Sequence, residues 1–295
     1  NIKGNEIGTI TVKDNIDGSS SMGGIYVDKV DSIKLDGNLN GDIFVNEEVN
    51  KIDAEGKKVT GDLILEKIAS SADVGTVEGD INVSTLDKGA QLNVDTVLEN
   101  TALGSTGKIS VSDAQGDIKV SNSVNEVDVV LNGGNLNVTN DAGTAEVVNN
   151  ALVSGTGNAT IDKAKTIELG GDLKGNITVN TSVDTINGGA AGIGKTVDGN
   201  VDVAQNTGSI TLGNVTGELK LGDAQGNVDV FQKAGNVDAM LNGGQLRVSQ
   251  VDEAGTAKVD GQGKAIIGKA SSIEANTSNG NLHLDGNNLQ IEGGP

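Results

Sequence analysis

The chain has 295 residues, of which 35% are hydrophobic, so it can bury a sizeable core and a disordered chain is not expected. Its net charge of −20 is spread along the sequence, and Arg247 is the only arginine, which excludes a typical nucleic acid-binding or anionic membrane-binding protein. There is no cysteine, and no apolar run approaches about 18 residues, so we expect no disulfide, no thiolate metal site and no membrane insertion.

The hydrophobic residues are almost all aliphatic. Tyr26, Phe44 and Phe231 are the only aromatic residues, so the core must consist of Val, Ile, Leu and Ala. Sandwiches and barrels usually contain larger side chains, whereas a narrow solenoid lumen does not need them. The 44 glycines and the single Pro295 indicate tight turns between strands that are not interrupted by proline.

Short runs with alternating hydrophobic and polar residues recur along the chain and predict β-strands. Most of them open with Gly-Asp or Gly-Asn, as expected for a strand that follows a turn. No helical pattern is sustained, so the sequence predicts an all-β protein. In chain order, clear examples are residues 8–12, 41–45, 79–83, 116–120, 175–179 and 226–230.

The chain contains two diverged copies of one pattern. Residues 33–52 match 167–186 at an offset of 134, and residues 75–83 match 213–221 at an offset of 138. Residues 113–134 then match 223–244 at an offset of 110, so a block of length 138 − 110 = 28 is missing from the second copy. A stack of repeats can lose one whole layer because each layer contacts only its neighbours. We therefore predict a parallel β-helix, that is, a β-solenoid.

The missing block suggests the size of one coil. Three strand-turn units make about 30 residues, similar to this block, so we expect three strands per coil of about 28–30 residues and about ten coils. The alternative is a set of tandem β-sandwich domains of about 110 residues, against which the scarcity of aromatic residues and the missing block both weigh.

The expected organisation has four parts. Residues 1–30 form an N-terminal entry region, either a cap or a strand donated to a neighbour; 31–150 form the first copy; 151–262 form the second copy, one coil shorter; and 263–295 form a closing coil. The first residue, Asn1, indicates a processed chain or a fragment, and removal of a signal peptide is one explanation.

Residues 36–47 match the calcium-loop pattern D-x-[DN]-x-[DN]-G-x5-E. The oxygen ligands would come from Asp36, Asn38, Asn40 and Glu47. In its usual setting this loop lies between helices, whereas here both flanks resemble strands. The second copy keeps the glycines and aliphatic residues but not the ligands, so a solenoid turn explains half of the motif without calcium. Calcium is nevertheless the one cofactor that the sequence suggests.

Other motifs give little support for catalysis. Residues 189–196 read G-x4-G-K-T, but a strand pattern follows where a nucleotide-binding loop needs a helix, so a bulged corner is expected. His283 is the only histidine and is expected on an outer face, and Arg247 has no basic cluster around it. We predict no catalytic residues and no enzyme activity.

The recurring Gly-Asp-Ile-x-Val units, the scarce arginine, the absence of cysteine and the acidic, Asn-rich composition resemble β-solenoid stalks of bacterial secreted surface proteins. These include adhesin stalks and subunits of S-layers or extracellular filaments. The same units also look like bactofilins, cytoskeletal β-helical polymers that have shorter coils. The resemblance covers the whole chain in style, without a shared diagnostic motif, and it implies polymerisation or surface display.

The resulting expectation is a non-enzymatic extracellular structural protein of the cell surface, which assembles with itself through the solenoid ends into a filament or layer. Its partner would be itself, with a further contact to cell wall or glycan, and without nucleic acid. Two alternatives stay open: a monomeric adhesin or binding stalk, and a cytoskeletal β-helical polymer. A carbohydrate-active enzyme would instead need a cleft where carboxylates converge with Arg247 or with lysines.

Overall fold

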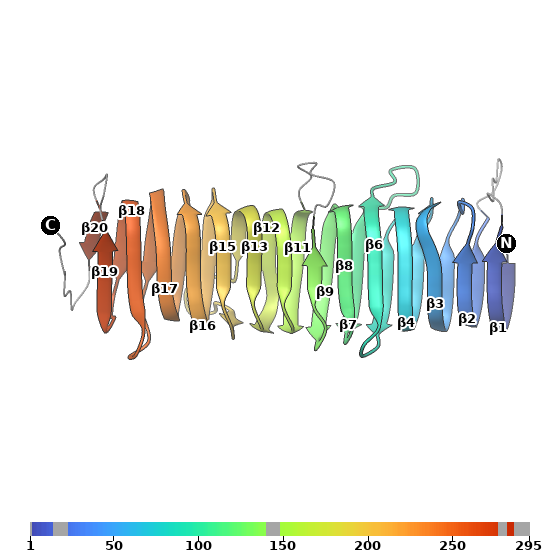
Figure 1. The fold of residues 1–295 in the computed structure, drawn as a ribbon, viewed down its shortest axis with the longest axis horizontal. Helices are drawn as coiled ribbons and strands as arrows, with labels where there is room; N and C mark the ends of the chain where they lie inside the picture. Colours follow the sequence, from blue (N-terminus) through green and yellow to red (C-terminus); the bar gives the residue numbers. More distant parts are fainter. Residues whose placement is uncertain (1, 14–22, 140–147, 277–281, 286–295) are drawn as a thin grey trace. The chain divides into compact units, whose positions relative to one another are not determined.

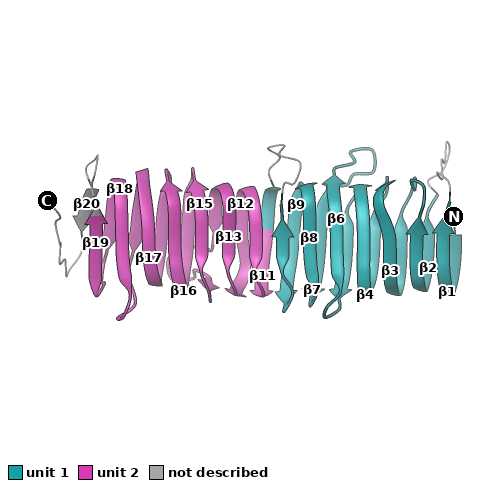
Figure 2. Cartoon of the chain, viewed as in Figure 1, with its two compact units in different colours: residues 1–151 teal, residues 152–295 magenta. Residues whose placement is uncertain are grey.

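A computed structural model of the chain describes residues 2–13, 23–139, 148–276 and 282–285. The chain divides into two compact units, Asn1–Ala151 and Leu152–Pro295 (Figure 2). Much of the expected closing region, 263–295, lies outside the described residues. Each unit is built from parallel strands that stack side by side (Figure 1).

The chain is all-β, with 76% of the described residues in strands; these strands stack as β-solenoid turns, about 14 in total over the two units, and no helix occurs within the described ranges. The first unit contains β1 (Ile2–Val12), β2 (Ile25–Leu35), β3 (Ile43–Val59), β4 (Leu63–Glu78), β5 (Ile81–Leu86), β6 (Gln91–Leu98), β7 (Lys108–Ala114), β8 (Asp117–Val124), β9 (Glu126–Asn132) and β10 (Leu136–Val138).

The next strand, β11 (Val148–Thr156), spans the boundary of the two units. The second unit continues with β12 (Ala159–Lys174), β13 (Ile177–Asn187), β14 (Thr196–Val197), β15 (Val201–Asn206), β16 (Ser209–Ala224), β17 (Asn227–Val248), β18 (Thr256–Ile267), β19 (Ser272–Asn276) and β20 (Leu282–Asp285).

The strand ladders of both units are parallel, which confirms the predicted fold class. Antiparallel sheets are the basis of β-sandwich domains, so the tandem-sandwich alternative is wrong. Two parallel strands can pair only if the chain crosses back between them, so that both run in the same direction. In this protein each crossover completes one turn of the solenoid.

One turn consists of two similar half-turns. In the turn that begins at Leu63, buried side chains follow each other at spacings of two, three and four positions, and this series then repeats. The inward residues of this turn are Leu63, Leu65, Ile68, Ala72, Val74 and Val77. The series closes where Leu63 pairs with Ile81, so two strand-turn units complete one turn.

The predicted coil with three strands is therefore too long. The sequence number advances by 18 from Ile25 to its partner Ile43, and by 20 from Ile43 to its partner Leu63. The second unit has a similar spacing, with an advance of 18 from Val201 to Leu219. Shorter turns are the reason that the chain has about 14 of them and not ten.

The block that the second copy lacks has the length of one turn of the first unit, and this turn is an unusual one. Ile81 pairs with Ile109, and 109 − 81 = 28. Most of the extra length lies in a loop, residues 99–107, that projects between β6 and β7 and is closed by a bridge between Asn100 and Ser105; two further residues are gained in the turn between β5 and β6. The alignment offsets place both Ile81 and Ile109 opposite Leu219 of the second copy. The missing block therefore gives the length of this single turn and not that of the others.

The four residues gained by the second copy also have a structural place. The sequence number advances by 24 from Ile177 to its partner Val201, whereas it advances by 20 from Ile43 to Leu63. The difference falls in the loop 188–195 between β13 and β14, the glycine-rich stretch for which the sequence predicts a bulged corner.

The core consists of aliphatic rows that run from turn to turn. One row of the first unit contains Ile25, Ile43, Leu63, Ile81 and Ile109. All five side chains are 0% exposed. Burial of one such side chain contributes about 1.5–3 kcal/mol, so the rows are the main source of stability. They also fix the register, because a slip by one residue would turn every inward side chain outward.

The recurring Gly-Asp and Gly-Asn pairs form the corners of the turns. A Cβ atom on Gly61 would lie 2.5 Å from the carbonyl carbon of Gly41, one turn earlier, and a Cβ on Gly79 would lie 2.6 Å from the carbonyl carbon of Gly61. Only glycine allows the corners to stack this closely. The next residue completes the contact: the Asp62 backbone N–H donates to Asp42 Oδ1 at 3.0 Å.

Candidate functional site

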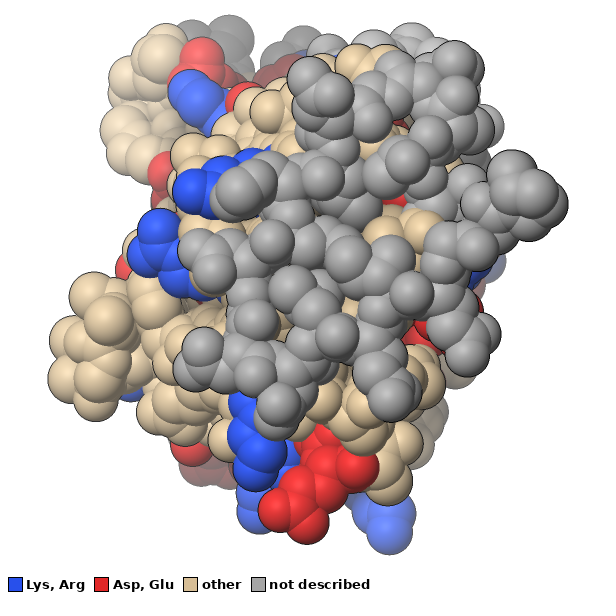
Figure 3. Space-filling model, turned by 90° about the vertical axis from the view of Figure 1, so that its left-hand side faces the viewer, with Lys and Arg blue, Asp and Glu red and all other residues tan. Residues whose placement is uncertain are grey.

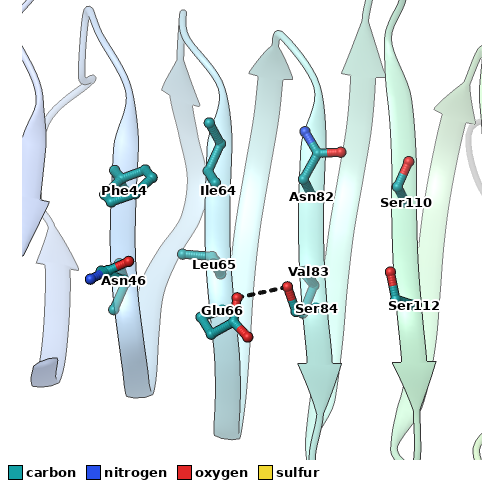
Figure 4. Close-up of a pocket in the computed structure, with 11 residues that line it drawn as sticks. Phe44, Asn46, Ile64, Leu65, Glu66, Asn82, Val83, Ser84, Ser110 and Ser112 are labelled. Atoms are coloured by element: carbon teal, nitrogen blue, oxygen red, sulfur yellow. Dashed lines mark hydrogen bonds between the residues drawn. The ribbon is translucent and has the colours of Figure 1, made fainter. Parts of the chain in front are cut away.

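A shallow groove of about 150 Å³ lies on the outer face of the first unit, across β3, β4, β5 and β7. Figure 4 shows its polar and apolar side chains in two rows that cross these strands. The first row contains Phe44, Ile64, Asn82 and Ser110. The second row contains Asn46, Glu66, Ser84 and Ser112.

Strand alternation places these residues outside the solenoid. Phe44 lies between the inward residues Ile43 and Val45, so its ring must point outward. Parallel register then aligns one residue per strand: Phe44 pairs with Ile64, and Ile64 pairs with Asn82. The Ile64 side chain is 38% exposed, which is high for isoleucine in a chain with a well-filled core.

Tyr26 continues the first row onto β2, where it pairs with Phe44. Its hydroxyl donates to Asp42 Oδ2 at 3.0 Å. Burial raises the pKa of Tyr26, and the hydrogen bond to Asp42 and the negative charge of that carboxylate raise it further. Gly24 lies beside this ring, since a Cβ there would be 2.9 Å from Tyr26 Cζ. The ring is therefore held in place at one end of the row.

The second row contains hydrogen-bonding groups. Ser84 Oγ donates to Glu66 Oε2 at 2.8 Å, and Asn46 Nδ2 lies 3.4 Å from Asp28 Oδ1. The groove lining contains one ionisable group, Glu66, and neither lysine nor arginine. Beside two apolar side chains, the groove thus offers amides, hydroxyls and one carboxylate.

The second unit has a different row on the corresponding strands. At the offsets 134, 138 and 110, the residues opposite Tyr26, Phe44, Ile64 and Ser110 are threonines and charged residues. In register this row contains Thr160, Thr178, Asp202, Lys220, Asp238 and Lys258. Lys220 Nζ lies 3.7 Å from Asp202 Oδ2, and Lys258 Nζ lies 3.8 Å from Asp238 Oδ1. The fold itself therefore does not require apolar residues in this row.

A charged ladder runs along a different part of the first unit. Lys67 Nζ lies 3.0 Å from Glu48 Oε2 and 2.9 Å from Asp87 Oδ2, and Glu48 Oε1 lies 3.5 Å from Lys29 Nζ. The hydrogen bond from Lys67 is the main cause that lowers the pKa of Glu48, and the bonds to Asp87 and Glu48 raise the pKa of Lys67. Figure 3 views the side that lies on the left of Figure 1, away from this ladder, and there too acidic and basic side chains lie next to each other.

Three of the proposed calcium ligands lie in the turn between β2 and β3, and Glu47 is exposed on β3. Asn38 Oδ1 accepts a hydrogen bond from the Lys58 backbone N–H at 3.0 Å, and Asn40 Oδ1 accepts one from Thr60 Oγ1 at 2.7 Å. Asp36 Oδ1 lies 3.2 Å from Lys34 Nζ. The two asparagine oxygens hold the next turn of the solenoid, and calcium binding stays a prediction.

The other candidate residues are dispersed. Arg247 Nε lies 3.5 Å from Asp229 Oδ1, and Lys195 lies in the loop before β14, which is a strand and not a helix. Nothing is described of the His283 side chain. Within the described ranges, no group of three or more His, Cys, Asp or Glu side chains is placed to hold a metal ion. No helix of that part of the chain could span a membrane.

The first strand has an incompletely covered apolar face. β1 pairs with β2 from Ile2↔Ile25 to Val12↔Leu35, so it is the first turn of this chain's own solenoid. Ile2 and Ile7 occupy inward positions but are only half-buried, whereas their partners Ile25 and Val30 are 0% and 1% exposed. Among the described residues, β1 has no second partner strand.

The sequence did not predict the groove. Its signal was present, because the sequence numbers of Tyr26 and Phe44 differ by 44 − 26 = 18 and both are the middle residue of an Ile-x-Val run. In a coil of three strands this spacing has no meaning, whereas in the shorter turn of this solenoid it stacks the two residues on adjacent strands.

Comparison of the chain with protein-family models, with curated proteins and with solved structures found no match. The β-solenoid is therefore established by the structure, and the resemblance to particular families of solenoids has no support beyond the sequence pattern.

Proposed function

We propose that the chain is a non-enzymatic structural protein of the bacterial cell surface that assembles with further copies of itself through the β1 end of its solenoid. The observation that supports this proposal best is the incomplete cover of Ile2 and Ile7 on β1. Equivalent side chains one turn further on are fully buried, so a strand added against β1 would bury apolar surface.

A second copy of the chain has the right pattern for this contact. The edge of β1 offers main-chain N–H and C=O groups to a parallel strand, and such an edge readily accepts a further strand. The chain repeats its inward aliphatic residues once per turn, in the register that β1 already uses toward β2. Stacking of turns from two copies therefore needs no new type of contact.

Within this proposal, the lead assignment is a secreted surface protein, such as an S-layer or extracellular filament subunit or an adhesin stalk. A cytoskeletal polymer like the bactofilins is the second candidate. The short turns of this solenoid favour the cytoskeletal polymer. The resemblance to bactofilins implies short coils, and the observed turns are shorter than the three-strand coil that we expect from the sequence. The layer or filament subunit and the cytoskeletal polymer would both be homo-polymers without chemistry of their own, whereas an adhesin stalk would stay monomeric.

Sedimentation velocity over a wide concentration range, together with electron microscopy, tests the assembly. We expect oligomers that grow with concentration, and loss of them in Ile7→Lys, which places a charge on the half-buried end. The matched control is Ile193→Lys, because Ile193 is 75% exposed in the loop before β14. Parallel samples with calcium or a chelator test the proposed calcium ligands.

Two results would contradict the proposal. One is a monomer at every concentration, with and without calcium. The other is assembly that Ile7→Lys and Ile193→Lys leave equally intact, since the contact would then not involve β1. Circular dichroism on each variant shows whether the solenoid is still folded.

A further inference from the structure

We propose that the groove across β3, β4, β5 and β7 is a binding site for an uncharged polysaccharide chain that lies across the strands. This inference is independent of the self-assembly proposed above, because the groove is on an outer face of the first unit and not on its β1 edge. It gives the expected glycan contact a specific location.

The apolar part of the row belongs to the first copy only. Phe44 corresponds to Thr178 of the second copy, and Ile64 corresponds to Asp202. Both pairs occupy the same register positions of the same fold. Since the solenoid forms with threonine and aspartate at these positions, packing does not require the phenylalanine and the isoleucine. Two of the chain's three aromatic residues, Tyr26 and Phe44, nevertheless lie next to each other in this row.

The shape of the groove favours a long ligand. Sites for small molecules usually have about 300–1,000 Å³ and enclose most of the ligand. This groove has about 150 Å³ and covers only one face of a ligand, so affinity must come from several contacts along a chain. Adjacent strands are about 4.8 Å apart, and the rows from β3 to β7 therefore extend over roughly 15 Å.

The chemistry of the two rows matches a chain of sugar rings. The faces of such rings carry C–H groups that pack on Phe44 and Ile64, and their edges carry hydroxyls. The amides of Asn46 and Asn82 can both donate and accept hydrogen bonds, and the serine hydroxyls can do the same. A polysaccharide has apolar ring faces and hydroxyl groups along its whole length. It can therefore make apolar contacts with the first row and hydrogen bonds with the second.

Charge and backbone pairing argue against other polymers. The only ionisable group in the lining is Glu66, and the protein has a net charge of −20, so an anionic chain is repelled. An extended peptide would bind best as an added strand. β4 already pairs with β3 on one side and with β5 on the other, so this mode is closed at the groove.

Affinity electrophoresis in gels that contain a soluble polysaccharide tests the site. The uncharged probes are hydroxyethyl cellulose, xyloglucan and glycogen, and polygalacturonate is the anionic probe. The test variants are Phe44→Thr and Ile64→Asp, which introduce the residues of the second copy. Thr178→Ser is the control at the equivalent position of the second unit. Tyr26 is the only tyrosine and tryptophan is absent, so tyrosine fluorescence reports on the end of the row.

We expect retardation by at least one uncharged polysaccharide, a change in Tyr26 fluorescence on binding, and at least tenfold weaker binding by both test variants. Thr178→Ser should bind like the wild type, and polygalacturonate should not retard the protein. The site assignment is overturned if none of the uncharged probes retards the protein, if Phe44→Thr and Ile64→Asp bind as well as the wild type, or if polygalacturonate binds equally well. Sedimentation of Phe44→Thr should match the wild type, which separates this outcome from that of the assembly proposal.

Discussion

Asp62 Oδ1 accepts a hydrogen bond of 2.8 Å from the backbone N–H of Asp80, the residue that occupies the same corner one turn later. The same contact joins Asp42 to the Asp62 N–H. In the second unit, Asn176 accepts from the Asn200 N–H at 2.8 Å. At these three corners, the side chain that follows the glycine thus satisfies a backbone donor of the next turn, which the strand ladder does not reach.

Asp62→Ala should weaken the corner between two turns. It leaves the Asp80 N–H without its acceptor, and such a loss costs about 1–3 kcal/mol. Asp62→Asn should be close to the wild type, because asparagine accepts the same bond in the second unit. Hydrogen exchange at the Asp80 amide measures the effect locally, with faster exchange expected in the alanine variant only. Equal protection in both variants would show that the side chain does not hold this donor.

Gly61→Ala should be strongly destabilising. The new Cβ would lie 2.5 Å from the carbonyl carbon of Gly41, and this neighbour is backbone that cannot move aside. Overpacking of this kind typically costs about 1–3 kcal/mol. Gly8→Ala is the control, since no atom lies within 4 Å of a Cβ at that position, and it should change stability by less than about 0.5 kcal/mol. Urea unfolding compares the two variants, and similar midpoints would contradict the close stacking of corners.

The charged ladder should make a small, pH-dependent contribution. Because the pKa of Glu48 is lowered in the folded state, its stabilising effect is complete above the pKa of an unfolded glutamate and is lost as the pH falls through the folded value. We expect a small difference in urea midpoint between the wild type and Glu48→Gln at neutral pH, which disappears in acid. The side chains are 30–43% exposed, so salt should reduce it too. A difference that persists unchanged in acid would exclude the ionised glutamate as its cause.

Local sequence signals predicted the local structure well. Gly-Asp-Ile-x-Val predicts a turn followed by an alternating strand, and residues 79–83 form this arrangement. The structure adds that the aspartate of this unit accepts a backbone hydrogen bond from the next turn, as Asp80 Oδ1 does from the Lys108 N–H at 2.9 Å. The local pattern does not determine how many such units make up one turn, because a solenoid with two units per turn and one with three have the same pattern. The choice between them depends on which strands become neighbours, for example on the pairing of Leu63 with Ile81.

The groove is also a property of stacking and not of any single segment. Phe44, Ile64 and Asn82 are far apart in sequence, and each is an ordinary outward residue of its own strand. Only the correct turn length places them in one row. The proposed calcium ligands show the opposite case, because the motif in residues 36–47 is continuous in sequence. Its Asn38 and Asn40 oxygens instead bond to the following turn.

Removal of residues 81–108 should leave a folded protein that is one turn shorter. The deletion joins Asp80 to Ile109, which takes the place of Ile81 against Leu63, because Ile81 and Ile109 are register partners. The second copy already has this arrangement, with Leu219 in the position of both residues. Each turn contacts only its neighbours, so loss of one turn removes its own contribution and leaves the remaining rows intact.

A deletion of residues 81–94 is the matched control, since it removes only part of the turn and places outward residues in line with the core rows. We expect the strand signal in circular dichroism and a cooperative unfolding transition for the deletion of the whole turn, and loss of both for the shorter one. If the longer deletion unfolded the chain as completely as the shorter one, the block would not be an independent turn, and the two copies would not share one stacking rule.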